Sequence, residues 1–311
     1  MTGVGIRELP AVGLAAVGGV GLAVQARLNG GLGASLGDGV VGSMISTGTG
    51  ILVLLAIVPG SRVGRRAMRQ IREALRVQGL RWWQCLGGVA GALYVVSQGV
   101  SVGSLGVGVF TVAVVGGTSA GSLAVDRAGL GPGGIRAITT RRVIGAAAGV
   151  SAVAVAGHDR LTGNGSLWLL ALPAVAGLGL SVQSALNGRV GAVAGFPWAA
   201  ALVNFVVAGC TLCIALPIEF LLRGKTPGSL PTELWLYCGG FVGVGVIAIA
   251  TSVVHRLGVL VFGLTSIAGQ LLGAVLLDTF GAHRPPATTW IAIAITLAAV
   301  AITVIRPTRT P

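Results

Sequence analysis

Charge is scarce in this chain. Only 9% of its 311 residues are Asp, Glu, Lys or Arg, whereas soluble domains carry about 25%. Hydrophobic residues make up 54% of the chain, and the mean hydropathy is +0.91. A soluble protein of this length could not bury so much apolar surface and keep a wettable exterior. The composition therefore excludes a soluble globular protein and indicates an integral membrane protein.

The residues that usually catalyse reactions or hold metals are also few. The chain has 3 His, 4 Cys and 8 acidic residues, with no metal-ligand spacing and no G-x-S-x-G in a strand-to-helix context. Cys210 and Cys213 form a CxxC pair without a His or a second pair nearby in sequence. We expect these cysteines to pack inside the protein rather than to bind metal. The absences predict a protein that is not an enzyme and has no metal and no cofactor.

Long runs without any charged residue account for most of the chain. A helix needs about 20 residues to cross the hydrocarbon core, and one run is long enough for two spans, with a break near 101–104. All 6 Trp lie near the starts of runs, at the headgroup level that such rings favour. The sequence predicts an all-α integral membrane fold of about ten transmembrane helices, from the runs 9–26, 39–61, 82–125, 143–157, 161–188, 190–218, 234–254, 257–277 and 285–305.

The basic residues predict the orientation of the chain. With a cytoplasmic N-terminus, alternating spans place sixteen Lys and Arg inside and five outside. Short cytoplasmic loops are enriched in these residues, so we expect both termini in the cytoplasm of a cell with a bacterial-type inner membrane. The same positions in short loops argue against nucleic acid as a partner, despite the net charge of +13. The five outside residues are Arg27, Arg160, Arg223, Lys225 and Arg284.

The cytoplasmic segment 62–76 has an unusual arginine pattern. At 100° per residue its arginines share one helical face, and apolar residues lie opposite. Two interpretations stay open: a solvated loop that fixes the orientation, or an interfacial helix that touches anionic lipid. The arginines are Arg62, Arg65, Arg66, Arg69, Arg72 and Arg76.

The chain is a duplication. Residues 23–30 (AVQARLNG) match 181–188 (SVQSALNG) at an offset of 158, and later segments match at an offset of 152. The repeats, 1–157 and 158–311, each hold five predicted spans, so the second enters the membrane inverted. Inverted repeats are typical of alternating-access transporters, whose site lies where the halves meet. Matches at the offset of 152 include Trp83 with Trp235, Gly87 with Gly239, Gly117 with Gly269 and Asp126 with Asp278.

These motifs resemble those of a known transporter family. The Q-x-x-x-N-G sequence that ends the first predicted helix of each repeat, and GQLLGAVLLDTFG at 269–281 with its echo at 117–129, are similar to the YdcZ-like branch of the drug/metabolite transporter superfamily. The resemblance covers nearly the whole chain. It implies a ten-helix basket of two fused five-helix units, and export or exchange of small metabolites or drugs. The first repeat departs from the pattern, with Thr118 where the second has Gln270.

Polar side chains within the predicted spans are the candidate substrate-binding residues, because they are costly in a bilayer. Gln25 with Asn29, and Gln183 with Asn187, are four residues apart and share a helix face. Counting the helix rise from Leu9 places Gln25 near the outer interface, and inversion places the second pair near the inner one. We expect these pairs to act at the two mouths of the transport path, or to hydrogen-bond between helices.

A second group of candidates lies deeper. Asn204 and its repeat equivalent Ser46 fall close to mid-membrane by helix rise. We expect Asn204, with Tyr94, Gln98 and Gln270, to border a central cavity that contacts substrate. The alternative for these residues is again interhelical or backbone hydrogen bonding.

The sequence therefore predicts a secondary transporter, an exporter or exchanger of small metabolites or drug-like solutes, working as a monomer or homodimer. Acidic residues such as Asp126, Glu219 and Asp278 fall at span ends, whereas proton-driven antiporters usually need an intramembrane carboxylate. This favours a facilitator, an exchanger, or coupling through an end-located Asp. Two other classes stay open: a passive channel, which needs a continuous polar lining, and a membrane-embedded lipid-handling or partner protein.

Overall fold

The computed structural model describes residues 9–131, 134–135, 138–158, 167–224, 227–280 and 285–304. Within them it leaves out the side chains of 141–142, 222–223, 250–252, 254–262, 264 and 299–304. This part of the chain is almost entirely helical and contains no strand, which confirms the all-α prediction. The helices are α1 (Leu9–Leu36), α2 (Gly39–Gly60), α3 (Arg62–Arg76), η2 (Trp82–Cys85), α4 (Gly87–Ala128), α5 (Thr140–Ala156), α7 (Trp168–Ala194), α8 (Pro197–Arg223), η3 (Leu234–Cys238), α9 (Gly239–Thr279) and α10 (Ala287–Val304).

Five helical stretches of the described chain are long and apolar enough to cross a membrane. The longest, Trp82–Ala128, has 47 residues, about 70 Å at 1.5 Å per residue, which is more than twice the hydrocarbon thickness. Shorter apolar helices include Val143–Ala156, Leu234–Ile249 and Ala287–Ala298. The other four stretches are Leu9–Leu36, Gly39–Gly60, Leu167–Ala194 and Pro197–Leu221.

The long helix α4 is broken at one residue. Gly106 has φ 80° and ψ 163°, a backbone conformation that is open essentially to glycine alone. The sequence-based expectation of a break at 101–104 is therefore wrong by a few residues. Ser101 and Ser104 lie within the helical segment that precedes this break.

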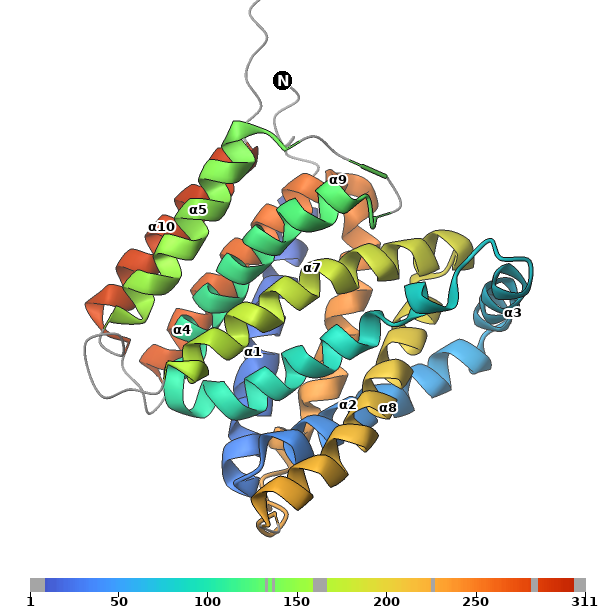
Figure 1. Ribbon diagram of the computed structural model, residues 1–311, viewed down its shortest axis with the longest axis horizontal. Coiled ribbons are helices and arrows are strands. Elements are labelled where there is room, and N and C mark those ends of the chain that lie inside the picture. Colours follow the sequence, from blue (N-terminus) through green and yellow to red (C-terminus); the bar gives the residue numbers. More distant parts are fainter. Residues whose placement is uncertain are drawn as a thin grey trace, which may run out of the picture.

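The first-half helices pack against second-half helices (Figure 1). α1 lies along α9, α4 lies along α7, α2 contacts α8, and α5 runs beside α10 at one edge of the bundle. If each helix is replaced by its equivalent in the other repeat, the pair α1–α9 becomes the pair α7–α4. The pairs α2–α8 and α5–α10 stay the same. The interface between the halves therefore runs through the middle of the molecule.

Glycines let these helices approach backbone to backbone. A side chain at Gly88 would collide with the carbonyl of Asn204, and one at Gly240 would collide with the carbonyl of Ser46. Gly88 matches Gly240 at the offset of 152, and Ser46 matches Asn204 at 158. In the same way, a side chain at Gly117 would collide with the carbonyl of Ala174, and one at Gly269 would collide with the carbonyl of Ala16. Small residues at such crossings allow the close packing that holds helices together in a bilayer.

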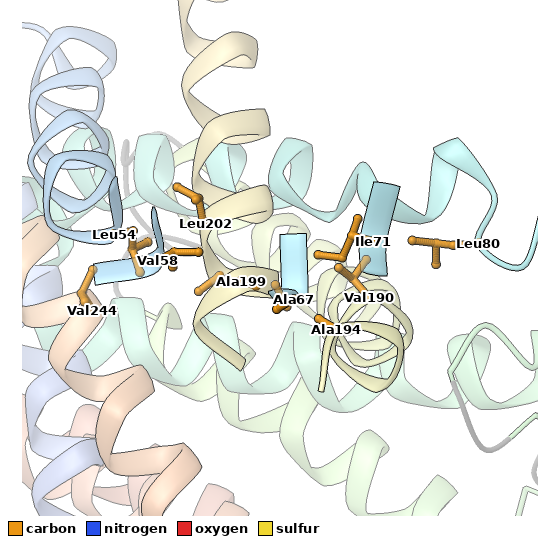
Figure 2. Close-up of a cluster of buried hydrophobic side chains, with 12 residues drawn as sticks. Leu54, Val58, Ala67, Ile71, Leu80, Val190, Ala194, Ala199, Leu202 and Val244 are labelled. Carbon is orange, nitrogen blue, oxygen red and sulfur yellow. The ribbon is translucent and has the colours of Figure 1, made fainter. Parts of the chain in front are cut away.

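The arginine-rich segment forms a true helix, α3, beside the bundle. Ala67 and Ile71 on its apolar face are buried in a cluster with Val190 and Ala194 of α7 (Figure 2). The middle of the apolar face thus contacts protein, whereas Val63 and Leu75 near its two ends are 58% and 37% exposed. All six arginines of the opposite face are exposed.

Two local expectations are wrong. α1 continues ten residues beyond the charge-free run, to Leu36, because a single Arg27 does not end a helix whose other residues remain apolar or small. Cys210, Cys213 and Cys238 are exposed instead of packed inside, and Cys85 is half-buried.

Candidate functional site

A cluster of amide and hydroxyl groups lies where α1, α2 and α4 meet the start of α9. Asn29 donates from Nδ2 to Oε1 of Gln98 at 2.6 Å, and both side chains are fully buried. The side-chain oxygen Oδ1 of Asn29 and the hydroxyl of Ser46 both lie against Gly239. Gln25 lies one turn before Asn29, with its amide nitrogen against Gly243 of α9. We call Gln25, Asn29, Ser46 and Gln98 the Asn29 cluster.

A second cluster lies where α7 and α8 meet the start of α4. Oδ1 of Asn204 accepts two hydrogen bonds of 3.1 Å, from Nε2 of Gln183 and Nδ2 of Asn187. These amides lie against Gly87 and Gly91 of α4. We call Gln183, Asn187 and Asn204 the Asn204 cluster.

The two clusters are built from equivalent positions of the two repeats. Gln25, Asn29 and Ser46 match the three members of the Asn204 cluster at the offset of 158, and Gly87 and Gly91 match Gly239 and Gly243 at 152. In each case the polar side chains come from one repeat and the glycines from the other. Each cluster is therefore part of the interface between the halves.

One face of α4 joins the clusters. Gly87, Gly91, Tyr94 and Gln98 follow each other at spacings of four, three and four residues, so they fall on one helical face over about 16 Å of rise. The hydroxyl of Tyr94 lies close to the side chains of Gln98 and Gln270, and Tyr94 is buried between the clusters. Polar groups thus follow each other from Asn187 at one end to Asn29 at the other. We call this row of groups along α4 the polar stripe.

Several atoms of this polar stripe have unused hydrogen-bonding capacity. Within the described part of the chain, Oδ1 of Asn29, Nε2 of Gln98 and Oε1 of Gln183 are buried without a hydrogen-bond partner. Each such atom costs about 1–3 kcal/mol when it stays unpaired. Buried unpaired groups of both donor and acceptor type can bond to a polar solute that enters between the helices, and they offer it no net charge.

The predicted site residues therefore fall into two groups. The structure brings Tyr94, Gln98 and Gln270 together and links them to Asn29. Asn204 bonds with Gln183 and Asn187 instead of joining Tyr94. Gln25 and Ser46 lie against the same stretch of α9 as Asn29. Because α1 runs to Leu36, Gln25 lies about 16 Å from the end of its helix, deeper than the sequence-based estimate.

Asp278 was expected at a span end, but its environment could not be deduced from sequence. It is 3% exposed, and its two carboxylate oxygens accept hydrogen bonds from the amides of Val107 and Gly108, at 2.8 and 2.7 Å. These amides open the second segment of α4 directly after the break at Gly106. A carboxylate at this position satisfies amides that the break leaves without partners, and it complements the helix dipole. The match with Asp126 and the place of Asp278 in the motif at 269–281 were the signals in the sequence that pointed to it.

The described residues contain no group of three or more His, Cys, Asp and Glu side chains placed to hold a metal ion. Asp38, another acidic residue at a span end, caps α2 by accepting the amides of Val40 and Val41, both at 2.9 Å. The chemistry that this site offers is therefore hydrogen bonding by neutral amides, one phenol and one hydroxyl.

Comparison with known proteins identifies the family of the chain. The model of the family described as "Putative inner membrane exporter, YdcZ" matches residues 10–155 and 168–304. The two matched segments correspond to the two repeats and together cover most of the chain. No curated protein and no solved structure matches the chain. The family is a class of transporters rather than of enzymes, and the chain belongs to it: it is a multi-pass inner membrane protein of the YdcZ exporter family.

Proposed function

We propose that this protein is a secondary transporter that exports or exchanges small metabolites or drug-like solutes by alternating access. The observation that carries the proposal is the pair of equivalent amide clusters at the interface between the halves. Asn29 and Ser46 lie about 10 Å from the helix ends at the α1–α2 connection. Asn187 and Asn204 lie equally far from the helix ends at the α7–α8 connection.

The fold behind this mechanism is an inverted repeat of ten spans, divided into 1–157 and 158–311. α4 supplies two spans, one on each side of Gly106, and α9, with 41 residues, is long enough for two more. Five spans per repeat then put the α1–α2 and α7–α8 connections on opposite faces of the membrane. The contact of Gly88 with Asn204 and that of Gly240 with Ser46 join equivalent positions of the two repeats, which supports the symmetry.

We also propose that both termini are cytoplasmic. Among the described residues, exposed arginines on α3 and at the end of α4 lie on the side that this orientation places inside. Part of the charge count lies outside the described residues, namely Arg7, Arg136, Arg160, Lys225, Arg284, Arg306 and Arg309. With this orientation the Asn29 cluster faces the outer mouth and the Asn204 cluster the inner one.

In this mechanism the solute moves between the clusters along the α4 stripe. Tyr94, Gln98 and Gln270 hold it midway, and the amides of the two clusters release their mutual hydrogen bonds when the mouth beside them opens. Such bonds are weak, about 0.6 kcal/mol on average between helices in a bilayer, so a solute can exchange for them. The neutral lining favours solutes with hydrogen-bonding groups over ions.

Cysteine labelling tests alternating access. Ser46→Cys and Asn204→Cys, each in a protein whose four native cysteines are Ser, occupy equivalent positions in the two clusters. A membrane-impermeant thiol reagent should reach the first from outside and the second from inside. A transported solute, found by thermal-shift screening, should change the two labelling rates in opposite directions. Rates that change together would contradict alternation.

Counterflow in proteoliposomes separates a transporter from a channel. A transporter takes up labelled solute faster when the vesicles contain unlabelled solute, and uptake saturates. A passive channel shows neither behaviour, because the solute moves only down its own gradient.

A further inference from the structure

Two glutamines of the polar stripe are held in opposite orientations by asparagines. Oε1 of Gln98 accepts the hydrogen bond from Nδ2 of Asn29 at 2.6 Å, which leaves Nε2 of Gln98 buried without a partner among the described residues. Nε2 of Gln183 instead donates to Oδ1 of Asn204 at 3.1 Å, which leaves Oε1 of Gln183 buried in the same condition. The two side chains are chemically identical, but Gln98 offers a donor and Gln183 offers an acceptor.

A further acceptor lies beside the donor of Gln98. Oδ1 of Asn29 is also buried without a hydrogen-bond partner in the described part of the chain, and it belongs to the amide that is joined to Gln98. A solute with acceptors alone leaves this oxygen unpaired, and a solute with donors alone leaves Nε2 of Gln98 unpaired. Each unpaired buried group lowers the affinity, so the joined amides favour a solute that carries both a donor and an acceptor.

The hydrogen-bonding groups of this site are neutral. The hydroxyl of Tyr94 lies close to the side chains of Gln98 and Gln270, and the amides of the two clusters lie against glycines of α4 and α9. A charged solute would find no opposite charge among these groups. Burial of an unpaired ion costs far more than burial of a neutral amide that keeps its hydrogen bonds, so the solute that fits best is uncharged.

An aromatic pair lies next to the donor. The ring centroids of Tyr94 and Phe110 are 6.1 Å apart, and the ring planes are tilted by 40°. Both rings belong to one buried apolar cluster with Ala23 of α1 and Ala274 of α9. Tyr94 lies one turn before Gln98 on the same face of α4. Aromatic rings beside a polar anchor favour a flat ring in an offset or edge-to-face arrangement.

We propose that the polar stripe recognises an uncharged aryl or heteroaryl amide, in which a carbonyl and an N–H are attached to a flat ring. The carbonyl of the solute accepts from Nε2 of Gln98, its N–H donates to Oδ1 of Asn29, and its ring packs against Tyr94. Further along the stripe, Oε1 of Gln183 offers an acceptor to the same N–H. The inference rests on the proposed transport function, because it names the class of solute that the same site takes.

Three ligands of nearly the same shape test the polarity of the site. Benzamide carries a donor and an acceptor, benzoate carries acceptors and a negative charge, and benzamidinium carries donors and a positive charge. Binding of each to the purified full chain in detergent is measured by ligand-observed NMR. Saturable binding of benzamide, roughly tenfold or more tighter than that of either ion, is expected. Absence of saturable benzamide binding, or an ion that binds as tightly, overturns the proposal.

A fourth ligand tests the N–H contact on the unaltered protein. Acetophenone has the ring and the carbonyl of benzamide, with a methyl group in place of the amide nitrogen. It should bind roughly fivefold or more weakly than benzamide at equal free concentration, because Oδ1 of Asn29 stays unpaired. Equal binding overturns the proposal, since the carbonyl and the ring alone would then account for the affinity.

Variants locate the binding. Gln98→Met removes the donor and should weaken benzamide binding roughly tenfold or more. Ser97→Ala is the matched control and should bind as wild type, because the buried Ser97 hydroxyl is already bonded to the carbonyl of Tyr94 at 2.6 Å. If Gln98→Met does not fold, Gln98→Asn, which withdraws the donor by one carbon, decides. Wild-type binding by a folded Gln98 variant, or an equal loss in Ser97→Ala, overturns the proposal.

The failure of this inference is distinguishable from the failure of the proposed function, because binding is measured without transport. Benzamide binding in a protein that shows no counterflow would leave this inference standing and contradict the proposed function. Counterflow of other solutes without benzamide binding would do the reverse.

Discussion

The two repeats agree in their backbone contacts and differ in their side chains. Gly88 and Gly240 meet the carbonyls of equivalent residues, and Gly117 and Gly269 do the same one span further on. At the polar clusters the equivalence stops. The second repeat has Asn204, whose Oδ1 accepts two hydrogen bonds, where the first has Ser46, whose side chain has no carbonyl to offer.

The first repeat compensates from another helix. Asn29 bonds to Gln98 of α4, whereas the position equivalent to Gln98 in the second repeat is Ala250. A helix crossing at backbone distance tolerates only glycine, but a hydrogen bond can be supplied from several directions. The duplicated chain has therefore kept its packing residues and let its polar residues diverge, which gives the two clusters different chemistry.

The largest effect is expected at the shared contacts. Gly88→Val and Gly240→Val should each destabilise the fold by roughly 3 kcal/mol or more, since the added side chain meets a backbone carbonyl that cannot move aside. Thermal unfolding in detergent measures the loss. Gly245→Val, where no atom lies within 4 Å of the added Cβ, is the control. Tolerance at only one of the two positions would break the equivalence of the repeats.

A second comparison concerns Asp278 and Asp126. Asp278→Ala should cost about 2–3 kcal/mol, because two buried amides after Gly106 lose a charged acceptor. Asp278→Asn should recover part of this, since its carbonyl can accept one of the two bonds. Asp126→Ala should cost less, because Asp126 is only half-buried. Unfolding temperatures of the three variants check the order, and a larger loss at Asp126 would contradict it.

Sequence reasoning predicted the equivalence of the repeats better than the neighbours of each residue. The offsets identify Asn29 with Asn187 and Gly87 with Gly239, because both copies keep the same residue types. They do not say that Asn187 lies against Gly87, since that contact depends on how one repeat packs on the other. The bond from Gln183 to Asn204 joins two helices, and no spacing within one helix encodes it.

The errors in local structure have similar causes. The end of α1 was expected at the Q-x-x-x-N-G motif, but the helix continues to Leu36, and Arg27 remains within it and is only partly exposed. The break in α4 was placed at serines, although the positive φ of the break requires the nearby Gly106. The burial of Asp278 depends on that break, so it could not be deduced before the break itself was located.

A smaller effect on stability, with a larger one on transport, is expected at the diverged position. Asn204→Ser gives the second repeat the residue of the first. It should cost about 1 kcal/mol through two lost bonds but lower uptake at least tenfold, because Gln183 and Asn187 lose their common acceptor. Asn204→Leu should show the same imbalance. Both quantities are measured on the same purified variants, and normal uptake by a destabilised Asn204→Leu would assign the residue to the scaffold.

The smallest effect concerns α3, which has no equivalent helix among the described residues of the second repeat. We propose that its exposed arginines bind anionic lipid headgroups, each contributing about 1 kcal/mol near a charged surface. Replacing Arg66, Arg69 and Arg72 with Gln should remove most of the stabilisation that phosphatidylglycerol gives over phosphatidylcholine in thermal unfolding. The difference should also shrink at high salt, where exposed charges are screened.

Glu73→Gln supplies the opposite change on the same helix. Glu73 is exposed among the arginines of α3, so its neutralisation should increase the preference for phosphatidylglycerol. The middle of the apolar face is already covered by Val190 and Ala194 of α7, and a purely structural α3 would therefore respond little to either lipid or charge. An unchanged lipid preference in both variants would leave α3 as a packing element that fixes orientation through its charge alone.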